Sequence, residues 1–555
     1  MNRIKVLIAV LLSVFILAGG FSVVSYADNT DYLGFSPIDE TRAAVYAKSK
    51  TGISGSVSIP LTCTVFGDQY EVTQVLENGF KGCADLTEVI LPGSITEIGA
   101  SAFENCGLNT LNIPAGIKKI GLNAFAGNKN LSSISAAPGN TEFIADGKAL
   151  YSADGKEFVQ FAVGNAGTYF VQSGTETIDS QAFAFSKLSC VVLPDSLKII
   201  GDDAFKESTS LSTVNFPTGL EIIGQGAFYK CFALKTVSLP LTLKSFEQGF
   251  TFAGVEALTL ADGIKEISQN SFKSCTGIKS VEIPDSVSVI CSGAFSGCTK
   301  LETIKMGDKI TEIGNEAFYN TAYYNNSGNR SNGALYYNNY LLALDPSYSG
   351  SFEVKNGTTL IADKAFYKCN SLTSVTIPGT VTAVNPYTFY DCQRLEAVKL
   401  PETIKSIGAY AFYNCLSLKG LYIPESVKQI DADAFKNSGN VVLYVVPGSY
   451  AERYAVNSGM VFSRDTLKVT SMPAKTSYNY KQSLDETGLK ISVFDGKERV
   501  LNRNEYTLEN TYFTKTGQNV VTVRYGNLKT QFTVDVSYSI WQWIIRILFL
   551  GFLWY

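Results

Sequence analysis

The sequence contains no histidine among its 555 residues. This absence excludes Ser-His-Asp and Cys-His nucleophile pairs and the zinc-protease helix motif, and it removes most metal sites that rely on imidazole ligands. No Cys-x-x-Cys pair occurs either, which weighs against metal binding by thiolates. We therefore expect no catalytic residues, no metal site and no cofactor.

Charge is also sparse, because charged residues make up 17% of the chain against 45% hydrophobic residues, and the net charge is −4. This composition is typical of a folded protein and not of a disordered one. Lysine and arginine form no basic stripe, so we expect no nucleic-acid partner. A chain of this length is long for one compact domain, which favours several domains or a repeat array.

Residues 1–27 are typical of a secretory signal peptide. Arg3 and Lys5 precede an apolar core from Val6 to Ala18, and Ser25-Tyr26-Ala27 supplies the small-x-small pattern of a cleavage site. The apolar core is short for a spanning helix, which favours cleavage over a retained anchor. We therefore expect an extracellular protein at the cell surface.

Residues 537–555 form an apolar, aromatic tail. The run from Ile540 to Tyr555 is interrupted by Gln542 and Arg546 and contains all three tryptophans of the chain. Aromatic residues at both ends suit the two membrane–water interfaces. Sixteen residues, however, span only about 24 Å of a core about 30 Å thick. We expect membrane or envelope association through this tail, with spanning, interfacial binding and a sorting signal all left open.

A repeat organises the chain between these ends. A phenylalanine recurs in a constant frame, and eleven of the thirteen intervals between successive copies are 22 or 23 residues. The two longer intervals, Phe125–Phe183 and Phe318–Phe366, each have room for a degenerate repeat plus an insertion. These anchors are Phe80, Phe103, Phe125, Phe183, Phe205, Phe228, Phe250, Phe272, Phe295, Phe318, Phe366, Phe389, Phe412 and Phe435.

Each repeat divides into two parts, as residues 395–418 illustrate. Val398 and Leu400 have the alternation of a short strand, which Pro401 ends because proline lacks a backbone donor. Ala411 and Cys415 then follow at the spacing of one helical turn beside the Phe anchor. One such unit cannot bury its own apolar face, so the pattern predicts a solenoid of short strands and short helical turns.

This frame resembles the BspA-like, or treponemal-type, leucine-rich repeats of bacterial surface proteins, over about residues 44–463. Residues 57–60 and 70–73 resemble the family's first repeat, and residues 449–455 resemble its closing helix, for which Ser449 and Glu452 form a capping box. The expected domains are a signal peptide (1–27), a leucine-rich-repeat solenoid with a helical cap (28–465), a domain over 466–536 and the tail (537–555).

Residues 466–536 break the repeat. Alternating runs such as 489–493, 520–523 and 532–534 predict strands separated by turns. The segment from Pro473 to Gly526 resembles the group 3 bacterial Ig-like domains, which implies a small all-β Ig-like sandwich acting as a spacer.

Cysteines recur at one repeat position, three residues after the Phe anchor. Other repeats have Asn or Ser in this position, which indicates a small buried site that meets backbone groups. We therefore expect free buried thiols and not the disulfide framework that eleven cysteines in a secreted chain would otherwise suggest. The cysteines concerned are Cys83, Cys106, Cys231, Cys275, Cys298, Cys369, Cys392 and Cys415.

Tyrosine is concentrated at another position, directly after the Phe anchor, and in the second long interval. Tyrosine gives contact area at low entropic cost and is enriched at binding surfaces. A partner-binding edge and a row that merely packs against loops both remain open, and the Ser/Thr-rich strand face is the alternative binding surface. The candidate residues are Tyr319, Tyr323, Tyr324, Tyr336, Tyr337, Tyr340, Tyr367, Tyr390 and Tyr413.

These features predict a secreted or cell-surface, adhesin-like protein that presents a repeat surface to a protein ligand. The family resemblance implies that this ligand is a host or matrix protein. A structural envelope protein without a soluble ligand is the second interpretation. A secreted enzyme is the third, and the missing histidines and the lack of an evident carboxylate pair weigh against it.

Overall fold

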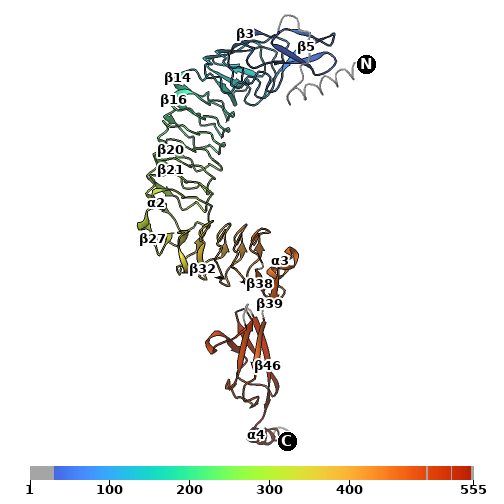
Figure 1. The fold of residues 1–555 in the computed structure, drawn as a ribbon, viewed down its shortest axis with the longest axis vertical. Coiled ribbons are helices and arrows are strands. Elements are labelled where there is room, and N and C mark those ends of the chain that lie inside the picture. The colour runs from blue at the N-terminus through green and yellow to red at the C-terminus, as the bar shows by residue number, and fades with distance from the viewer. Residues whose placement is uncertain (1–30, 440, 465, 495–497, 527, 552–555) are drawn as a thin grey trace. The chain divides into compact units, whose positions relative to one another are not determined.

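The computed structural model describes residues 31–551 except 440, 465, 495–497 and 527. The predicted signal peptide and the last four residues of the tail lie outside the described residues. The chain divides into two compact units, Met1–Ser327 and Gly328–Tyr555. Both consist mainly of stacked short strands, and the second unit also contains a separate all-β domain (Figure 1).

The strands of the first unit form two columns of short parallel strands. Successive copies pair in register at a distance of one repeat, as in the pairing of Thr236 with Ala257. One column has strands of four to six residues, except for the two-residue β18, and consists of β3 (Gly55–Ser58), β6 (Leu86–Ile90), β8 (Thr110–Ile113), β10 (Ser133–Ala136), β14 (Ala166–Phe170), β16 (Lys187–Val192), β18 (Thr213–Val214), β20 (Thr236–Leu239), β21 (Ala257–Leu260), β23 (Ser280–Ile283) and β25 (Thr303–Met306). The other column has two-residue strands and consists of β7 (Glu97–Ile98), β9 (Lys119–Ile120), β15 (Thr177–Ile178), β17 (Ile199–Ile200), β19 (Ile222–Ile223), β22 (Glu266–Ile267), β24 (Val289–Ile290) and β26 (Glu312–Ile313).

Additional strands lie at the N-terminal end and inside the first long interval. The N-terminal strands are β1 (Leu33–Pro37), β2 (Arg42–Ala47), β4 (Thr62–Val65) and β5 (Asp68–Val75), and β5 pairs with the two-residue column through β7. The first long interval contains the antiparallel strands β11 (Phe143–Ala145), β12 (Ala149–Ser152) and β13 (Glu157–Phe161). Because β13 pairs in parallel with β15, this insertion joins the stack as a degenerate repeat, as the interval predicted.

The second unit repeats the same plan. Its longer strands are β30 (Ser349–Glu353), β32 (Ser371–Thr376), β34 (Ala397–Lys399), β36 (Gly420–Ile423), β38 (Val442–Val445) and β39 (Phe462–Arg464), and its two-residue strands are β31 (Leu360–Ile361), β33 (Ala383–Val384), β35 (Ser406–Ile407) and β37 (Gln429–Ile430). The second long interval contains α2 (Ala322–Asn325), η1 (Ser327–Asn329), β27 (Arg330–Ser331), β28 (Ala334–Tyr337) and β29 (Tyr340–Leu344). Here too the last inserted strand, β29, pairs in parallel with the next repeat.

A helix closes the solenoid of the second unit. Helix α3 (Tyr450–Ser458) begins at Ser449, whose Oγ accepts a hydrogen bond from the Glu452 amide at 3.2 Å. The Glu452 carboxylate accepts one in return from the Gly448 amide at 2.6 Å. The helix ends at Gly459, whose φ of 68° is left-handed. The predicted cap is therefore present.

The C-terminal part of the second unit is a two-sheet β domain followed by a helix. One sheet has the order β40 (Thr466–Ser471), β42 (Lys490–Phe494), β43 (Glu498–Val500). The other has the order β41 (Ser477–Asn479), β46 (Leu528–Ser537), β45 (Gly517–Tyr525), β44 (Thr507–Glu509), with η2 (Arg503–Glu505) before β44. Helix α4 (Ile540–Gly551) follows β46. Among the described residues, no helix is long and apolar enough to cross a membrane.

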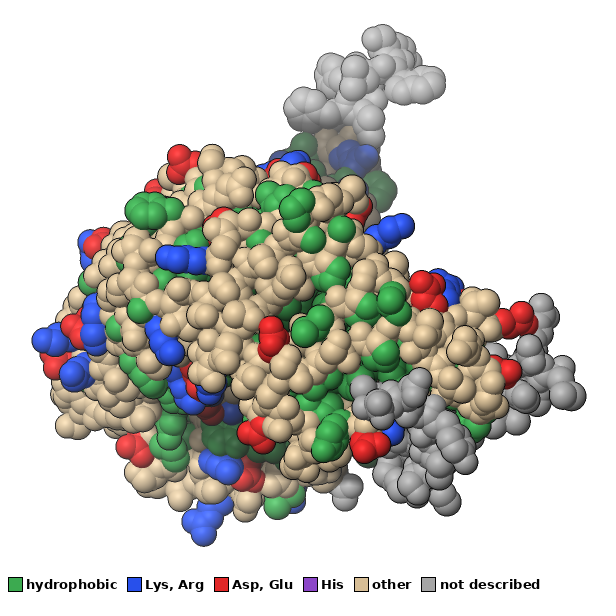
Figure 2. Space-filling view, turned by 90° about the horizontal axis from the view of Figure 1, so that it is seen from above, with side chains coloured by type: hydrophobic (Ala, Val, Ile, Leu, Met, Phe, Trp, Pro, Cys, Tyr) green, Lys and Arg blue, Asp and Glu red, His purple; other side chains and the backbone are tan. Residues whose placement is uncertain are grey.

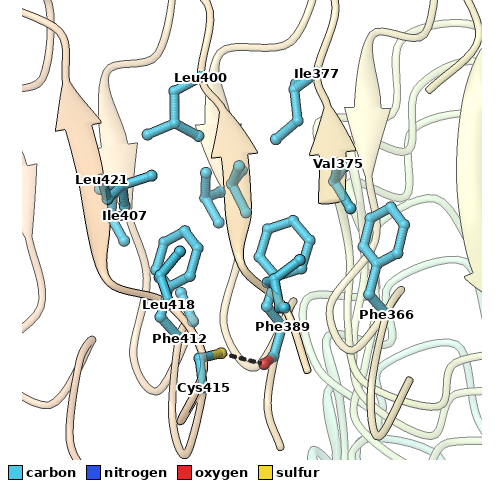
Figure 3. Packing of buried hydrophobic residues seen from close by; sticks show 14 of the residues in the cluster. Phe366, Val375, Ile377, Phe389, Leu400, Ile407, Phe412, Cys415, Leu418 and Leu421 are labelled. Atoms are coloured by element: carbon cyan, nitrogen blue, oxygen red, sulfur yellow. Dashed lines mark hydrogen bonds between the residues drawn. The ribbon is translucent and has the colours of Figure 1, made fainter. Parts of the chain in front are cut away.

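The Phe anchors form the centre of each core. They are buried and stack ring on ring, with centroid distances such as 4.9 Å between Phe366 and Phe389 and 5.2 Å between Phe389 and Phe412 (Figure 3). Burying one such ring contributes about 1.5–3 kcal/mol, so every rung depends on the rungs above and below it.

The cysteines of the repeat position bond to this column. The Cys415 thiol donates to the carbonyl oxygen of Phe389 at 3.1 Å (Figure 3). The Cys392 thiol donates to that of Phe366 at 3.0 Å. Ser208 makes the same contact through its hydroxyl, with Phe183 at 2.8 Å. This repeat position therefore requires a small side chain that donates a hydrogen bond to the Phe carbonyl of the preceding rung. The eleven cysteines are free, as predicted.

The segment around each Phe anchor is a pair of turns and not a helical turn. Tyr410 and Asn414, on either side of Phe412, have left-handed φ values of 54° and 55°, and the same pair recurs in the other repeats. Left-handed residues interrupt a right-handed helix. The Phe412 amide consequently donates to the Ala434 carbonyl of the next rung, at 2.8 Å. The predicted solenoid is confirmed, but its turns are not helical.

Candidate functional site

Tyrosines of three successive rungs stack along one lateral edge of the second unit. Tyr367, Tyr390 and Tyr413 each follow a Phe anchor, and the rungs bring them together as the constant spacing predicted. Their ring centroids are 5.2 Å apart between Tyr367 and Tyr390 and 4.4 Å apart between Tyr390 and Tyr413, with interplanar angles of 20° and 7°. All three side chains are half-buried.

A second column, which the sequence analysis missed, lies beside the first. Tyr387 and Tyr410 stack on each other at 5.2 Å, and each also contacts the tyrosine three residues later, at 5.7 Å and 5.8 Å. The sequence feature that could have predicted this column is the Tyr-x-x-Tyr spacing at 387–390 and 410–413. Tyr387 and Tyr410 occupy the left-handed position of the turn, which directs both columns to the same edge. We call these five tyrosines (367, 387, 390, 410 and 413) the tyrosine ladder.

Lysines cover the N-terminal end of the tyrosine ladder. The Lys364 ammonium lies 4.7 Å from the Tyr367 ring centroid and 5.9 Å from that of Tyr387, and the Lys368 ammonium lies 5.2 Å from the Tyr367 centroid. Such contacts place a cation over the negative face of the ring. Lys436 lies 5.7 Å from the Tyr410 centroid and pairs with Asp433 at 3.2 Å. The ring faces of the ladder therefore already have partners.

The phenol groups at the other end are held by hydrogen bonds. Asn437 donates to the Tyr413 hydroxyl at 2.7 Å. A hydrogen bond with the Asp433 carboxylate raises the pKa of Tyr410, because the anion stabilises the neutral phenol. Burial against neighbouring rings raises the pKa of Tyr390. Stacking and hydrogen bonds therefore order the ladder, and the phenols of Tyr390 and Tyr410 are neutral at physiological pH.

This geometry decides which ligands the edge suits. Stacking and the lysine contacts cover ring faces of these half-buried side chains, so they offer a ligand mainly ring edges, and a sugar ring or a quaternary ammonium group finds little open aromatic face. Ring edges combine apolar C–H surface with a hydroxyl that both donates and accepts hydrogen bonds. Rigid aromatic side chains of this kind are enriched where proteins contact proteins.

The candidate tyrosines of the first unit lie near its C-terminal end. Tyr319 is 50% exposed, and its ring packs edge-on against Tyr324 at 5.5 Å. Thr321 caps helix α2 by accepting the Tyr324 amide at 3.0 Å, and the Tyr323 amide donates to the Leu301 carbonyl at 2.7 Å. This short segment is therefore ordered by the last rung of its own unit.

The candidate tyrosines at the start of the second unit are less accessible. Tyr340 is 2% exposed and belongs to the core, which removes it from the set of contact residues. Tyr336 packs against the same core, and its hydroxyl accepts the Lys355 amide at 3.1 Å. Tyr337, paired with Tyr340 across the hairpin, stays half-buried. Of these three, Tyr340 alone is buried, and partner binding by Tyr336 and Tyr337 stays a prediction.

The strand face, the alternative binding surface, carries exposed hydroxyl side chains in rows. Thr110 pairs with Ser133, and Ser280 pairs with Thr303, all four of them exposed. Charges of both signs are interspersed on the face seen in Figure 2. On the strand face itself, Glu282 of β23 pairs with Lys305 of β25 at 2.5 Å. No single chemistry dominates this surface.

Among the described residues, no group of three or more Cys, Asp or Glu side chains could hold a metal ion. One carboxyl pair does occur, between Glu157 of β13 and Asp179 beside β15. Burial, followed by the hydrogen bond with Glu157, raises the pKa of Asp179 to about 8. The sequence analysis missed this pair because 22 residues separate its members. The pair lies where the first insertion joins the stack, and this location favours a structural role.

Comparison with known proteins identifies both parts of the chain. The family described as the BspA type leucine rich repeat region matches residues 61–152, 176–259, 249–332 and 347–454, more than half of the chain. The bacterial Ig-like domain (group 3) matches residues 471–536. No curated protein matches the sequence significantly.

Solved structures of bacterial leucine-rich-repeat proteins are similar in fold. A leucine-rich repeat protein from Bacteroides ovatus is 23% identical, with 80% of this chain and 100% of that chain covered and a TM-score of 0.33. A leucine rich cell surface protein from Faecalibacterium prausnitzii is 20% identical, with 80% and 96% covered and a TM-score of 0.26. A leucine rich repeat protein from T. pallidum is 17% identical, with 62% and 90% covered and a TM-score of 0.15.

The stacked rungs, the Phe column with its recurring donors and the family match over more than half of the chain agree with one another. Leucine-rich-repeat proteins of this type are scaffolds for protein–protein interaction. The chain belongs to the BspA-type leucine-rich-repeat family and carries a C-terminal group 3 bacterial Ig-like domain.

Proposed function

We propose that this protein is a secreted, cell-surface binding protein whose solenoid takes a protein ligand, a host or matrix protein, on the tyrosine ladder. The observation that carries the proposal is the ladder itself: five half-buried tyrosines on three rungs, ordered by stacking and by lysine and asparagine contacts. A few such anchors supply most of the energy of a typical interface.

The preorganisation of the ladder supports this assignment. A flexible surface loses about 0.5–1.5 kcal/mol for each side chain that binding immobilises. The rings of Tyr390 and Tyr413, stacked at 4.4 Å, are already immobilised by each other. Exposed Tyr319 is a separate candidate contact residue in the first unit.

The predicted signal peptide and tail supply the location in this proposal. Residues 1–27 direct export, the Ig-like domain acts as a spacer, and residues 537–555 keep the protein at the envelope. In this reading the protein has no catalytic activity and binds no nucleic acid.

Site-specific photo-crosslinking tests the ligand surface. Benzoylphenylalanine at position 390 retains an aromatic ring in the stack, and the same residue at position 374 samples the strand face of a neighbouring rung. The protein with each label is incubated with host extracellular-matrix extract and irradiated, and the crosslinked partner is identified. The purified partner is then titrated against wild type and against Tyr367→Ser/Tyr390→Ser/Tyr413→Ser.

We expect crosslinks from position 390 and at least a tenfold loss of affinity in the triple variant, about 1.4 kcal/mol. Ser351→Ala/Ser374→Ala, on the strand face, serves as the matched control and should bind normally. Crosslinks from 374 alone would place the site on the strand face. Absence of crosslinks from both positions would favour a structural envelope protein.

A further inference from the structure

Helix α4 is attached to the Ig-like domain through a polar stripe. Ser539 and Gln542 cap its first turn reciprocally, with 2.9 Å from the Ser539 amide to the Gln542 side chain and 3.2 Å from the Gln542 amide to the Ser539 hydroxyl. The Gln542 side chain also donates to the Tyr480 carbonyl at 2.9 Å. One turn later the Arg546 guanidinium lies 4.8 Å from the Tyr538 ring centroid. Because 542 and 546 are four apart, they share one face.

Among the described side chains of α4, those outside the polar stripe are apolar and exposed. Ile540 and Trp541 are 78% and 74% exposed, Trp543 and Ile545 are 55% and 54% exposed, and Ile544 is 39% exposed. At about 100° per residue these five side chains cover a wide arc on the side away from the polar stripe. A soluble domain seldom leaves such a contiguous apolar surface open unless the surface binds something.

The surroundings of α4 indicate what covers this arc. Two of its five apolar residues are tryptophans, whose amphipathic ring favours the membrane–water interface. The base of the helix is basic: Lys481 lies 5.6 Å from the Tyr480 ring centroid, and Tyr480 in turn contacts Tyr538 at 5.2 Å. With Arg546 these cations lie beside the apolar arc, at the level where lipid headgroups would be.

We propose that α4 lies in the plane of a bilayer interface that contains anionic lipid, with its apolar arc in the acyl boundary and its polar stripe on the Ig-like domain. This inference rests on the envelope location proposed above, and it names anionic lipid as the partner and binding in the plane of the interface as the mode. The cation–aromatic contacts at Tyr480 and Tyr538 hold Lys481 and Arg546 where anionic headgroups can pair with them. A second copy of the chain would bury the same arc but would leave these cations facing one another.

Intrinsic fluorescence makes this proposal directly testable, because all three tryptophans of the chain lie at positions 541, 543 and 554. The mature full-length chain is mixed with vesicles of phosphatidylcholine, with and without phosphatidylglycerol. Co-sedimentation, the shift of tryptophan emission and quenching by lipids brominated at different depths are measured. The variant Ile544→Glu/Ile545→Glu keeps the tryptophans, and Leu416→Glu/Val456→Glu, at exposed apolar positions of the same unit, is the matched control.

We expect co-sedimentation with the anionic vesicles, a blue shift and strongest quenching by shallow bromines. The Ile544/Ile545 variant should lower the partition coefficient by about tenfold or more, since one buried aliphatic side chain contributes about 1.5–3 kcal/mol, and the control variant should not. Quenching that is strongest at the bilayer centre would overturn the in-plane mode. Unshifted emission with no co-sedimentation, or emission already blue-shifted without lipid in a concentration-dependent way, would overturn the membrane partner. The vesicles contain no protein ligand, so a failure here is distinct from a failure of the tyrosine-ladder proposal.

Discussion

The recurring cysteine position offers a sharp test of what holds the rungs together. Cys392 is fully buried, and its thiol donates to the Phe366 carbonyl of the preceding rung at 3.0 Å. If the hydrogen bond is what selects the residue, its loss leaves the Phe366 carbonyl with the Cys369 amide, at 3.2 Å, as its remaining donor. That loss costs about 1 kcal/mol, the net contribution of one hydrogen bond, because the carbonyl keeps a partner and a thiol is a weak donor.

Three substitutions separate the hydrogen bond from the volume of the side chain. Cys392→Ser keeps a donor and loses some volume, and Ser208 shows that a hydroxyl reaches the anchor carbonyl, at 2.8 Å from Phe183. Cys392→Val approximately keeps the volume and loses the donor, and Cys392→Ala loses both. We expect the free energy of unfolding to fall by less than about 1 kcal/mol in Ser, by about 1–2 kcal/mol in Val and by the most in Ala.

The measurement must be local, because rungs of a solenoid unfold in segments. Hydrogen exchange of the amides of residues 366–395, together with urea unfolding, reports the stability of the affected rungs. Cys190, half-exposed on β16, is the control position, and Cys190→Ala should change stability by less than about 0.5 kcal/mol. A Val variant as stable as wild type beside a clearly weakened Ser variant would refute the reasoning, because volume and not the donor would then select the residue.

Two further predictions concern the first insertion and the C-terminal cap of the repeat stack. The pKa of Asp179 is raised from 3.8 to about 8 by burial and by the bond with Glu157, so its contribution to stability is present below about pH 4 and is lost as the pH rises through about 8. In Asp179→Asn, the urea midpoint should decrease less steeply with rising pH across that range. A slope equal to that of wild type would show that the pair does not titrate as described. Ser449→Ala removes the cap of α3 and should destabilise the last rungs by about 1 kcal/mol, measured by faster exchange in β38, whereas Ser458→Ala at the far end of the helix should not.

The repeat could be predicted from the sequence because it is a property of spacing. A constant interval of 22 or 23 residues fixes which side chains stack, so the Phe column, the cysteine position and the alignment of Tyr367, Tyr390 and Tyr413 follow from counting. The Ig-like domain could be predicted from the alternation of apolar and polar residues in its strands. Both parts are confirmed by the structure and by the family matches.

The turn geometry could not be predicted in the same way. The spacing of Ala411, Cys415 and Leu418 fits a helical turn, but Tyr410 and Asn414 adopt the left-handed conformation, and the Asn414 amide donates to the Lys436 carbonyl of the next rung at 3.1 Å. The preference for left-handed φ is weak in any one non-glycine residue, and it is the inter-rung hydrogen bonds that impose it here. Gly408 shows the same tertiary control, because a Cβ there would lie 2.7 Å from the backbone nitrogen of Pro386.

The insertions also limited the prediction of the site. Tyr336 and Tyr340 have the same composition signal as the ladder, yet the pairing of β28 with β29 turns Tyr340 into the core. Hairpin register is decided by contacts that no repeat spacing encodes. Tyr387 and Tyr410 were missed for the converse reason, since they lie at a turn position where the other repeats have residues such as Ser101, Gln181 or Lys364.

The tyrosine ladder combines two roles that are often treated as alternatives. Stacking at 4.4–5.2 Å contributes to the cohesion of three rungs, at about 0.5–1.5 kcal/mol per aromatic pair. The same stacking fixes the rings before any ligand arrives, so a ligand that contacts their edges does not have to order them. Replacing Tyr390 by Phe should therefore preserve the stack and its stability while removing one hydroxyl from the edge. A ligand that depends on the hydroxyls would lose affinity for this variant, and one that depends on the apolar ring edges would not.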